Sequence, residues 1–348
     1  LVNVTSSSHD YSRTLSGQLN QSLLDLGKWT SLKAARATAK AGDASYTAAE
    51  QDLLIRVATA YFDVLTAEDA LKFAQANEQA LNRQMEQAQQ RFEVGLSAIT
   101  DVNDAKAQHD TSVANVITAQ NTLDDNEEAL RQLTNKEPGT LKGLREKLPM
   151  DKPEPADPDE WVSVAVAQNP TLHSYAQQLE AAKANVQTAR SGHLPTLNGQ
   201  VLYSKTPSWS DNSASSFNEA FHTNSERWST TVGLTLNVPL FSGGFTQSRV
   251  RQTIFNRDNA QDQFELQKRL VERSTRNSYR AVIAGASQVE ATGQAVVSAQ
   301  SSLDATQAGY EVGTRTIVDV LLSQQQLLQA QSSYSQARHA FILNGLRL

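Results

Sequence analysis

An internal repeat limits what this chain can fold into more than any other feature. The segment Phe92 to Gly95 recurs as Tyr310 to Gly313, an offset of 218 residues, and an isoleucine, an aspartate and a valine follow both copies at matching positions. The match continues downstream, where Leu123 pairs with Phe341. Self-similarity over such a distance predicts two copies of one large structural unit in tandem.

Each unit begins with strand signals. From Thr231 to Leu240, apolar residues alternate with polar or small ones, which is the period of a strand with one apolar face. Weaker alternation predicts further strands and thus two hairpins, joined by loops at 6–13 and 204–227. The other strands are indicated by Leu15, Leu19 and Leu23, by Val2 and Val4, and by Leu197, Val201 and Tyr203.

Long helices follow the strands. The period changes to a helical one after Gly27 and after Gly243-Gly244, and heptad spacing predicts helices over about 30–94 and 246–312. At 1.5 Å per residue, each is about 100 Å long. Gly95 and Gly313 end these helices at the tip turns, and a returning helix follows each, so that each unit contains a long helical hairpin.

These patterns divide the chain into five segments. A segment rich in Pro, Lys and Glu and a helix broken at Asn169-Pro170 separate the units and predict a belt around the helices. The segments are a β-barrel hairpin at 1–29, helical hairpin 1 at 30–135, an equatorial belt at 136–192, a second β-barrel hairpin with an external loop at 193–243, and helical hairpin 2 at 244–348.

The repeat also predicts what lies beyond the two ends. The helix at 161–190 leads into the second pair of strands but has no counterpart before Val2, and Leu348 corresponds to Leu130. The chain begins with Leu1 rather than Met. We therefore expect a portion of a longer precursor, with a first helix and any signal peptide upstream.

Four strands cannot close a barrel alone. About eight strands are needed for closure, and an open edge in lipid leaves backbone groups unsatisfied. No run of about 18 apolar residues predicts a membrane-spanning helix. We therefore expect an α+β membrane protein in which several chains complete one water-filled β-barrel, continued by an α-helical barrel.

Composition argues against other classes of protein. A net charge of −6 without a basic stripe argues against nucleic acid as a partner, and cysteine is absent. The six histidines lack metal-ligand spacing, and no serine lies in a nucleophile elbow. We predict no catalytic residues, no metal, no cofactor and no enzymatic activity.

Two alternative functions fit part of the pattern. A soluble coiled-coil scaffold or a periplasmic adaptor would share the heptads, but neither needs alternating strands beside each helical pair. A lipid-anchored duct of the same architecture would need an N-terminal cysteine upstream of Leu1.

Several motifs resemble the TolC family of outer-membrane efflux channels, over essentially the whole chain. They are the segments 91–102, 192–197, 294–303 and 308–321. The resemblance implies a homotrimer with a twelve-stranded barrel in the outer membrane and a helical barrel that extends into the periplasm. It also implies docking to a periplasmic adaptor (membrane fusion) protein that connects an inner-membrane RND, ABC or MFS pump, for drug efflux or type I secretion.

The resemblance also implies a gate at the periplasmic helix tips. The matching gate residues are Thr100, Asp101, Tyr310 and Arg315. A ring of acids inside the entrance matches Asp319, but Leu322 replaces a second acid one turn further on. Asp101 and Asp319 each open a returning helix, so an alternative role for both is to stabilise a helix N-terminus.

Overall fold

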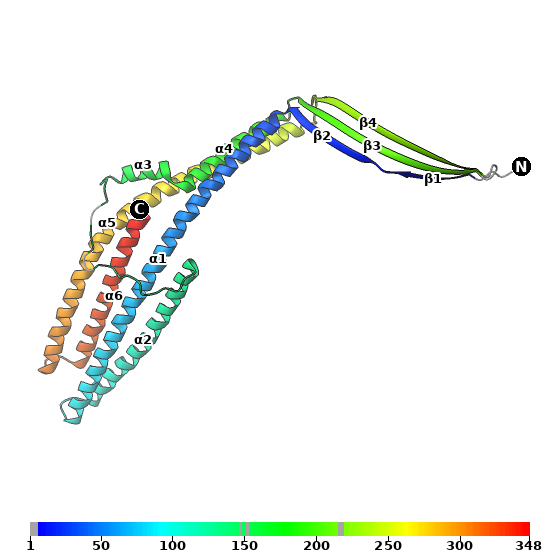
Figure 1. The fold of residues 1–348 in the computed structure, drawn as a ribbon. Helices are drawn as coiled ribbons and strands as arrows, with labels where there is room; N and C mark the ends of the chain where they lie inside the picture. The colour runs from blue at the N-terminus through cyan, green and yellow to red at the C-terminus, as the bar shows by residue number, and fades with distance from the viewer. Residues whose placement is uncertain (1–5, 146–147, 151–152, 215–218) are drawn as a thin grey trace. The chain divides into compact units, whose positions relative to one another are not determined.

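The computed structural model describes residues 6–145, 148–150, 153–214 and 219–348 (Figure 1). The chain forms two compact units. Unit 1 comprises Leu1–Asp43 and His173–Glu265, and unit 2 comprises Ala44–Leu172 and Leu266–Leu348. Helices α1 (Leu26–Glu93) and α5 (Phe245–Glu311) run from unit 1 into unit 2 without a break. Both long helices that the sequence predicts are therefore confirmed.

Unit 1 contains one antiparallel sheet, in which β1, β2 and β4 each pair with β3. Its four strands are β1 (Ser6–Ser12), β2 (Leu15–Leu24), β3 (Thr196–Ala214) and β4 (Glu219–Asn237). The predicted first hairpin stays a prediction, because its first strand, assigned to Val2 and Val4, lies outside the described residues. Within the described residues, β1 and β2 do not pair with each other. They follow one another along β3 in one continuous register, from Ser6 opposite Ala214 to Ser22 opposite Asn198.

The gap between β1 and β2 lies opposite a proline. The Arg13 amide still donates to the Pro207 carbonyl at 3.1 Å. Proline has no amide proton to return the bond, so the ladder loses one hydrogen bond there. β1 and β2 are consecutive parts of one long strand, whereas β3 and β4 form the predicted second hairpin.

Both predicted loops of the strand regions also need correction. The interval 6–13 contains β1, and most of 204–227 belongs to β3 and β4, which stay paired up to Ala214 opposite Glu219. Around Ser210 and Asp211, polar side chains lie on both faces of the sheet, so the alternation in hydropathy disappears while the backbone ladder continues. The strand predicted from Val2 and Val4 lies outside the described residues.

The two faces of the sheet differ in chemistry. Register places apolar side chains of three strands on one face, which we call the apolar face: Leu15, Leu19, Leu23, Leu197, Val201, Tyr203, Trp228, Val232, Leu234 and Leu236. The other face carries Ser, Gln, Asn and Thr side chains, such as Gln18, Asn198, Gln200 and Thr231. Trp228 is 72% exposed, so none of the described residues covers the apolar face at that point.

Three helices of unit 1 join the sheet at the same end. β2 leads into α1, α4 (Pro170–Ser191) leads into β3, and β4 leads into α5. The helix α1 begins earlier than predicted, at Leu26, because the Asp25 carboxylate accepts the Lys28 amide at 3.2 Å as a cap. Between α4 and α1, the Ser174 hydroxyl donates to the Ala41 carbonyl at 3.0 Å.

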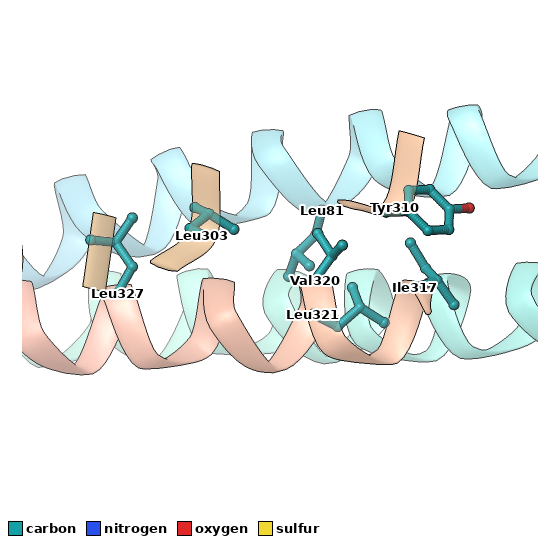
Figure 2. Packing of buried hydrophobic residues seen from close by; sticks show 7 residues of the cluster. All are labelled: Leu81, Leu303, Tyr310, Ile317, Val320, Leu321 and Leu327. Carbon is teal, nitrogen blue, oxygen red and sulfur yellow. The ribbon is translucent and has the colours of Figure 1, made fainter. Parts of the chain in front are cut away.

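Unit 2 is built from α1, α2 (Ile99–Thr134), α5 and α6 (Ile317–Arg347). Buried Ala60, Val64 and Ala67 on α1 pack against Leu123 and Leu130 on α2. A second cluster joins α1, α5 and α6 (Figure 2). Its members are Leu81, Leu303, Tyr310, Ile317, Val320, Leu321 and Leu327. The two helical hairpins therefore share this second cluster, to which α1 contributes Leu81.

The segment between the hairpins lies against the helices of unit 2. The Tyr61 hydroxyl donates to the Lys142 carbonyl at 2.7 Å, and Arg276 on α5 pairs with Asp159 at 3.0 Å. Asp159 lies in the first turn of α3 (Pro158–Gln168). The predicted break at Asn169-Pro170 is confirmed, because α3 ends there and Pro170 starts α4. That this segment forms a belt around a tunnel stays a prediction.

Candidate functional site

The turns at the two helix tips have the same backbone conformation. Gly95 has φ of +75° and Gly313 has φ of +81°, a region that favours glycine. After α1, the Gly95 amide donates to Phe92 and the Leu96 amide to Arg91, at 2.9 and 2.7 Å. The equivalent amides after α5 donate to Tyr310 and Gly309. Both turns are Schellman motifs, so the duplication preserves the geometry of the tips.

The helices that follow these turns begin differently. α6 starts with a capping box, in which the Thr316 hydroxyl accepts the Asp319 amide and one Asp319 carboxylate oxygen accepts the Thr316 amide at 2.9 Å. These hydrogen bonds from Thr316 lower the pKa of Asp319, with a smaller contribution from Arg315. α2 instead starts after Ala98, which has no cap hydroxyl, so no capping box occupies the Asp101 carboxylate.

Tyr310 is the buried member of the predicted gate. It is 7% exposed, and the guanidinium carbon of Arg91 lies 4.8 Å from the centre of its ring. Burial raises the pKa of the Tyr310 hydroxyl, Arg91 opposes that rise, and the charge of Asp101 adds to it. The hydroxyl has no hydrogen-bond partner among the described residues, so this single chain lacks the predicted bond to Asp101.

The remaining gate residues are accessible. Thr100 and Arg315 are exposed, and Asp319 is partly exposed. The stem of Arg315 lies over Gly309, where an added Cβ would stand 2.7 Å from the Arg315 Cγ. One chain therefore brings Tyr310 and Asp101 into electrostatic range of each other. It leaves Thr100 and Arg315 on its surface, where a neighbouring chain could reach them.

Arg91 is not among the predicted gate residues, although it is the first residue of the motif segment 91–102. Its counterpart in the second sequence repeat is Gly309, so comparison of the two repeats does not indicate a cation at this position. A polar cluster between α1 and α6 is likewise not predicted from the sequence. There, the Ser335 hydroxyl donates to Asp69 at 2.6 Å, and the Nδ1 atom of His339 lies 2.8 Å from the Thr66 hydroxyl.

His339 is held as a neutral imidazole. The Thr66 hydroxyl donates its proton to the Phe62 carbonyl at 2.7 Å, so His339 Nδ1 must be the donor to Thr66. Burial lowers the pKa of His339, and Arg338 lowers it further, whereas Asp69 opposes the shift. Protonation would therefore add a charge where the imidazole is 7% exposed.

This burial predicts a loss of stability in mild acid. The pKa of His339 is about 6.5 in an unfolded chain and lower in the folded one, so its contribution is fully present above pH 6.5 and falls below it. The residue equivalent to His339 in the first sequence repeat is Asn121. We expect His339→Asn to reduce the fall in melting temperature between pH 7.5 and 5.5 by a few degrees. The exposed His193→Asn is the control, and equal curves for wild type and His339→Asn would contradict the assignment.

Other kinds of site find little support in the described part of the chain. No group of three or more His, Cys, Asp or Glu side chains there could hold a metal ion. Among the helices described, none is long and apolar enough to cross a membrane.

Comparisons with known proteins agree on one group. The sequence model of a family described as "Outer membrane efflux protein" matches residues 2–136 and 161–348. Outer membrane protein TolC of Escherichia coli (strain K12) is 39% identical over 334 residues, which cover 95% of this chain and 67% of that protein. The alkaline protease secretion protein AprF of Pseudomonas aeruginosa is 29% identical and is covered to 68%. The crystal structure of outer membrane protein VceC from Vibrio cholerae superposes with a TM-score of 0.78 at 18% identity, covering 99% of this chain and 85% of that one.

Proposed function

This chain belongs to the outer membrane efflux protein family, and from that premise we propose that three copies of it form one gated exit duct. The family consists of transport ducts of the outer membrane rather than enzymes, and we assign no catalytic residue. A soluble scaffold or a periplasmic adaptor is excluded by the family, since this chain is an outer-membrane channel of efflux and secretion.

The apolar face of the sheet carries the proposal. From Trp228 to Leu236 it extends about 26 Å at 3.3 Å per residue. At the tilt of about 40° usual for barrel strands, this length spans about 20 Å of height, close to the apolar band of about 25 Å on outer-membrane barrels. Beyond Trp228 the same face carries ion pairs, Lys205 with Glu226 and Asp211 with His222. An apolar band of this height, followed by charge, suits the lipid of the outer membrane on one side and water above it.

The sheet edges suggest the number of copies. In the described residues, β3 pairs on both sides, whereas β4 and the β1–β2 strand each keep one edge without a partner. Such edges in lipid must pair with another strand. The described sheet is three strands wide, namely β1–β2, β3 and β4. With the further strand predicted from Val2 and Val4, three chains would give the twelve-stranded barrel that the sequence resemblance implies, continued by α1, α2, α5 and α6 as a helical barrel in the periplasm.

The helix tips would form the gate of this duct. Arg315 is exposed, and the Asp101 carboxylate takes no part in a capping box. These features support links from Arg315 to Thr100 and Asp101 of a neighbouring chain, and from Tyr310 to Asp101 of its own chain once the tips are assembled. Asp319 would line the entrance with its second carboxylate oxygen, because the cap uses one oxygen only.

Members of the family work with adaptor and pump partners. For this chain, we infer docking to a periplasmic adaptor protein that links it to an inner-membrane RND, ABC or MFS pump. Of the relatives, TolC is named an outer membrane protein, and AprF is named an alkaline protease secretion protein. Drug efflux and type I secretion are therefore the two export routes to test.

Chemical cross-linking of the full-length protein in detergent tests the oligomer. We expect a ladder that ends at three chains, because each chain leaves two sheet edges to be paired. The same sample denatured before cross-linking is the control. A stable folded monomer, or a ladder that continues past three, would contradict the trimeric barrel.

A further inference from the structure

We propose that Arg91 is a positioning residue of the gate. Its guanidinium contacts the face of the Tyr310 ring, and this contact holds the two helical hairpins of one chain together in the closed state. The proposal rests on the gate described above and adds a residue to it. Arg91 lies in the last turn of α1 and Tyr310 in the last turn of α5. The contact therefore joins hairpin 1 to hairpin 2 at their tips.

The geometry is that of a cation–π contact. The guanidinium carbon of Arg91 lies 4.8 Å from the centre of the Tyr310 ring, inside the range of about 6 Å over which the ring face attracts a cation. The ring is 7% exposed and also belongs to the cluster of α1, α5 and α6 (Figure 2). Removal of water from one side of such a contact strengthens the attraction.

Unpaired polar atoms at the same place point to a network that is completed elsewhere. The Arg91 Nε and Tyr310 hydroxyl atoms are both buried, and neither has a hydrogen-bond partner among the described residues. Buried donors without partners are rare, so each needs an explanation. The Asp101 carboxylate is the charged acceptor that acts on Tyr310 here, and movement of α2 toward it could satisfy the hydroxyl.

The duplication shows that this contact is specific to one pair of positions. Arg91 of the first sequence repeat corresponds to Gly309 of the second repeat. Tyr310 of the second repeat corresponds to Phe92 of the first. A side chain at position 309 would displace the Arg315 stem, because an added Cβ would lie 2.7 Å from the Arg315 Cγ. One hairpin therefore supplies the cation and the other the ring.

Arg91 and Asp101 would act on different parts of the same tyrosine. Arg91 contacts the ring face, which Tyr310→Phe retains, whereas the proposed gate link uses the hydroxyl, which Tyr310→Phe removes. With the ring fixed by Arg91, the hydroxyl keeps one direction and needs no reorientation to meet Asp101. The two interactions can thus be separated by substitution.

Single-channel recording of the full-length protein in a planar bilayer tests the role. We expect Arg91→Met, which keeps an unbranched apolar stem without the charge, to raise the ratio of open to closed channels at least about ten-fold. A contact of this kind shifts an equilibrium a few-fold, and the trimer has three copies. Arg91→Lys, which keeps a cation, should restore most of the closed population. The exposed Arg83→Met on the same helix is the matched control and should behave like wild type.

The background variants decide between a local packing defect and the proposed contact. Arg91→Met should still open the channel further in a Tyr310→Phe background, where the ring remains, and should add nothing in a Tyr310→Leu background, where it is gone. Equal opening by Arg91→Met and Arg91→Lys, or an undiminished effect in Tyr310→Leu, would overturn the inference. If Tyr310→Phe with Arg315→Ser opens the channel while Arg91→Met does not, the inference fails and the gate stands. If none of them opens it, the gate itself is wrong.

Discussion

The double variant Tyr310→Phe with Arg315→Ser should show a markedly higher single-channel conductance than wild type. Each polar link contributes about 0.5–1.5 kcal/mol net. Two links per chain in a trimer therefore total about 3–9 kcal/mol if they are additive. About 5.5 kcal/mol is enough to move a two-state gate from 1:99 to 99:1. Loss of both links thus lies in the range that converts a mostly closed channel into a mostly open one.

The single variants provide the internal control for this experiment. Tyr310→Phe and Arg315→Ser should each have a smaller effect, since one set of three links remains. The Tyr310→Phe ring keeps its place in the buried cluster, so opening would not reflect loss of the tip fold. Unchanged conductance in the double variant would reject the assignment of both residues to the gate.

Asp319→Asn should abolish block of the channel by a trivalent cation, and Leu322→Asp should tighten it. Three copies of Asp319 around the entrance would form a negative constriction, and carboxylate oxygens are suitable ligands for hard cations. Leu322 is 53% exposed and lies three residues further along the same face of α6. A carboxylate there would raise the ring from three acids to six, and the first unit already carries Asp104 at the equivalent position.

The choice of asparagine separates two roles of this aspartate. Its amide oxygen can still accept the Thr316 amide, so the helix cap survives while the charge is lost. Asp319→Ala loses both. If Asp319→Asn retains wild-type block and Asp319→Ala does not, the residue matters as a cap. If neither variant changes the block, the acid ring is elsewhere.

The helices could be predicted from the sequence because their signals are local and long. Heptads repeat over many turns, and Gly95 and Gly313 mark the ends through a backbone conformation that other residues rarely adopt. Strand identity was harder. Where one side of the sheet is apolar, as around Val232, alternation predicted the strand, but it vanished where both sides are polar, as around Asp211. Pairing with β3 decides the structure there, and hydropathy does not report it.

The gate region was predicted by resemblance and not by pattern. Asp101 and Asp319 occupy equivalent positions in the repeat, and nothing local separates their roles. The difference comes from their neighbours, since Thr316 completes a capping box that Ala98 cannot. Arg91 could not be predicted at all, because its partner is 219 positions away on another helix and its own repeat counterpart is a glycine.

The length of the strands has a consequence for what the cell presents to its surroundings. β3 and β4 contain 19 residues each, about 63 Å at 3.3 Å per residue, and less than half of that length is apolar. The three helices that join the sheet, α1, α4 and α5, do so at its other end, so the polar half would project outward as paired strands rather than loose loops. An antibody, toxin or phage would contact strands whose backbones are held by hydrogen bonds along their whole length. Such a surface can vary through substitution of its side chains, whereas an inserted residue would shift every later pair to the opposite face.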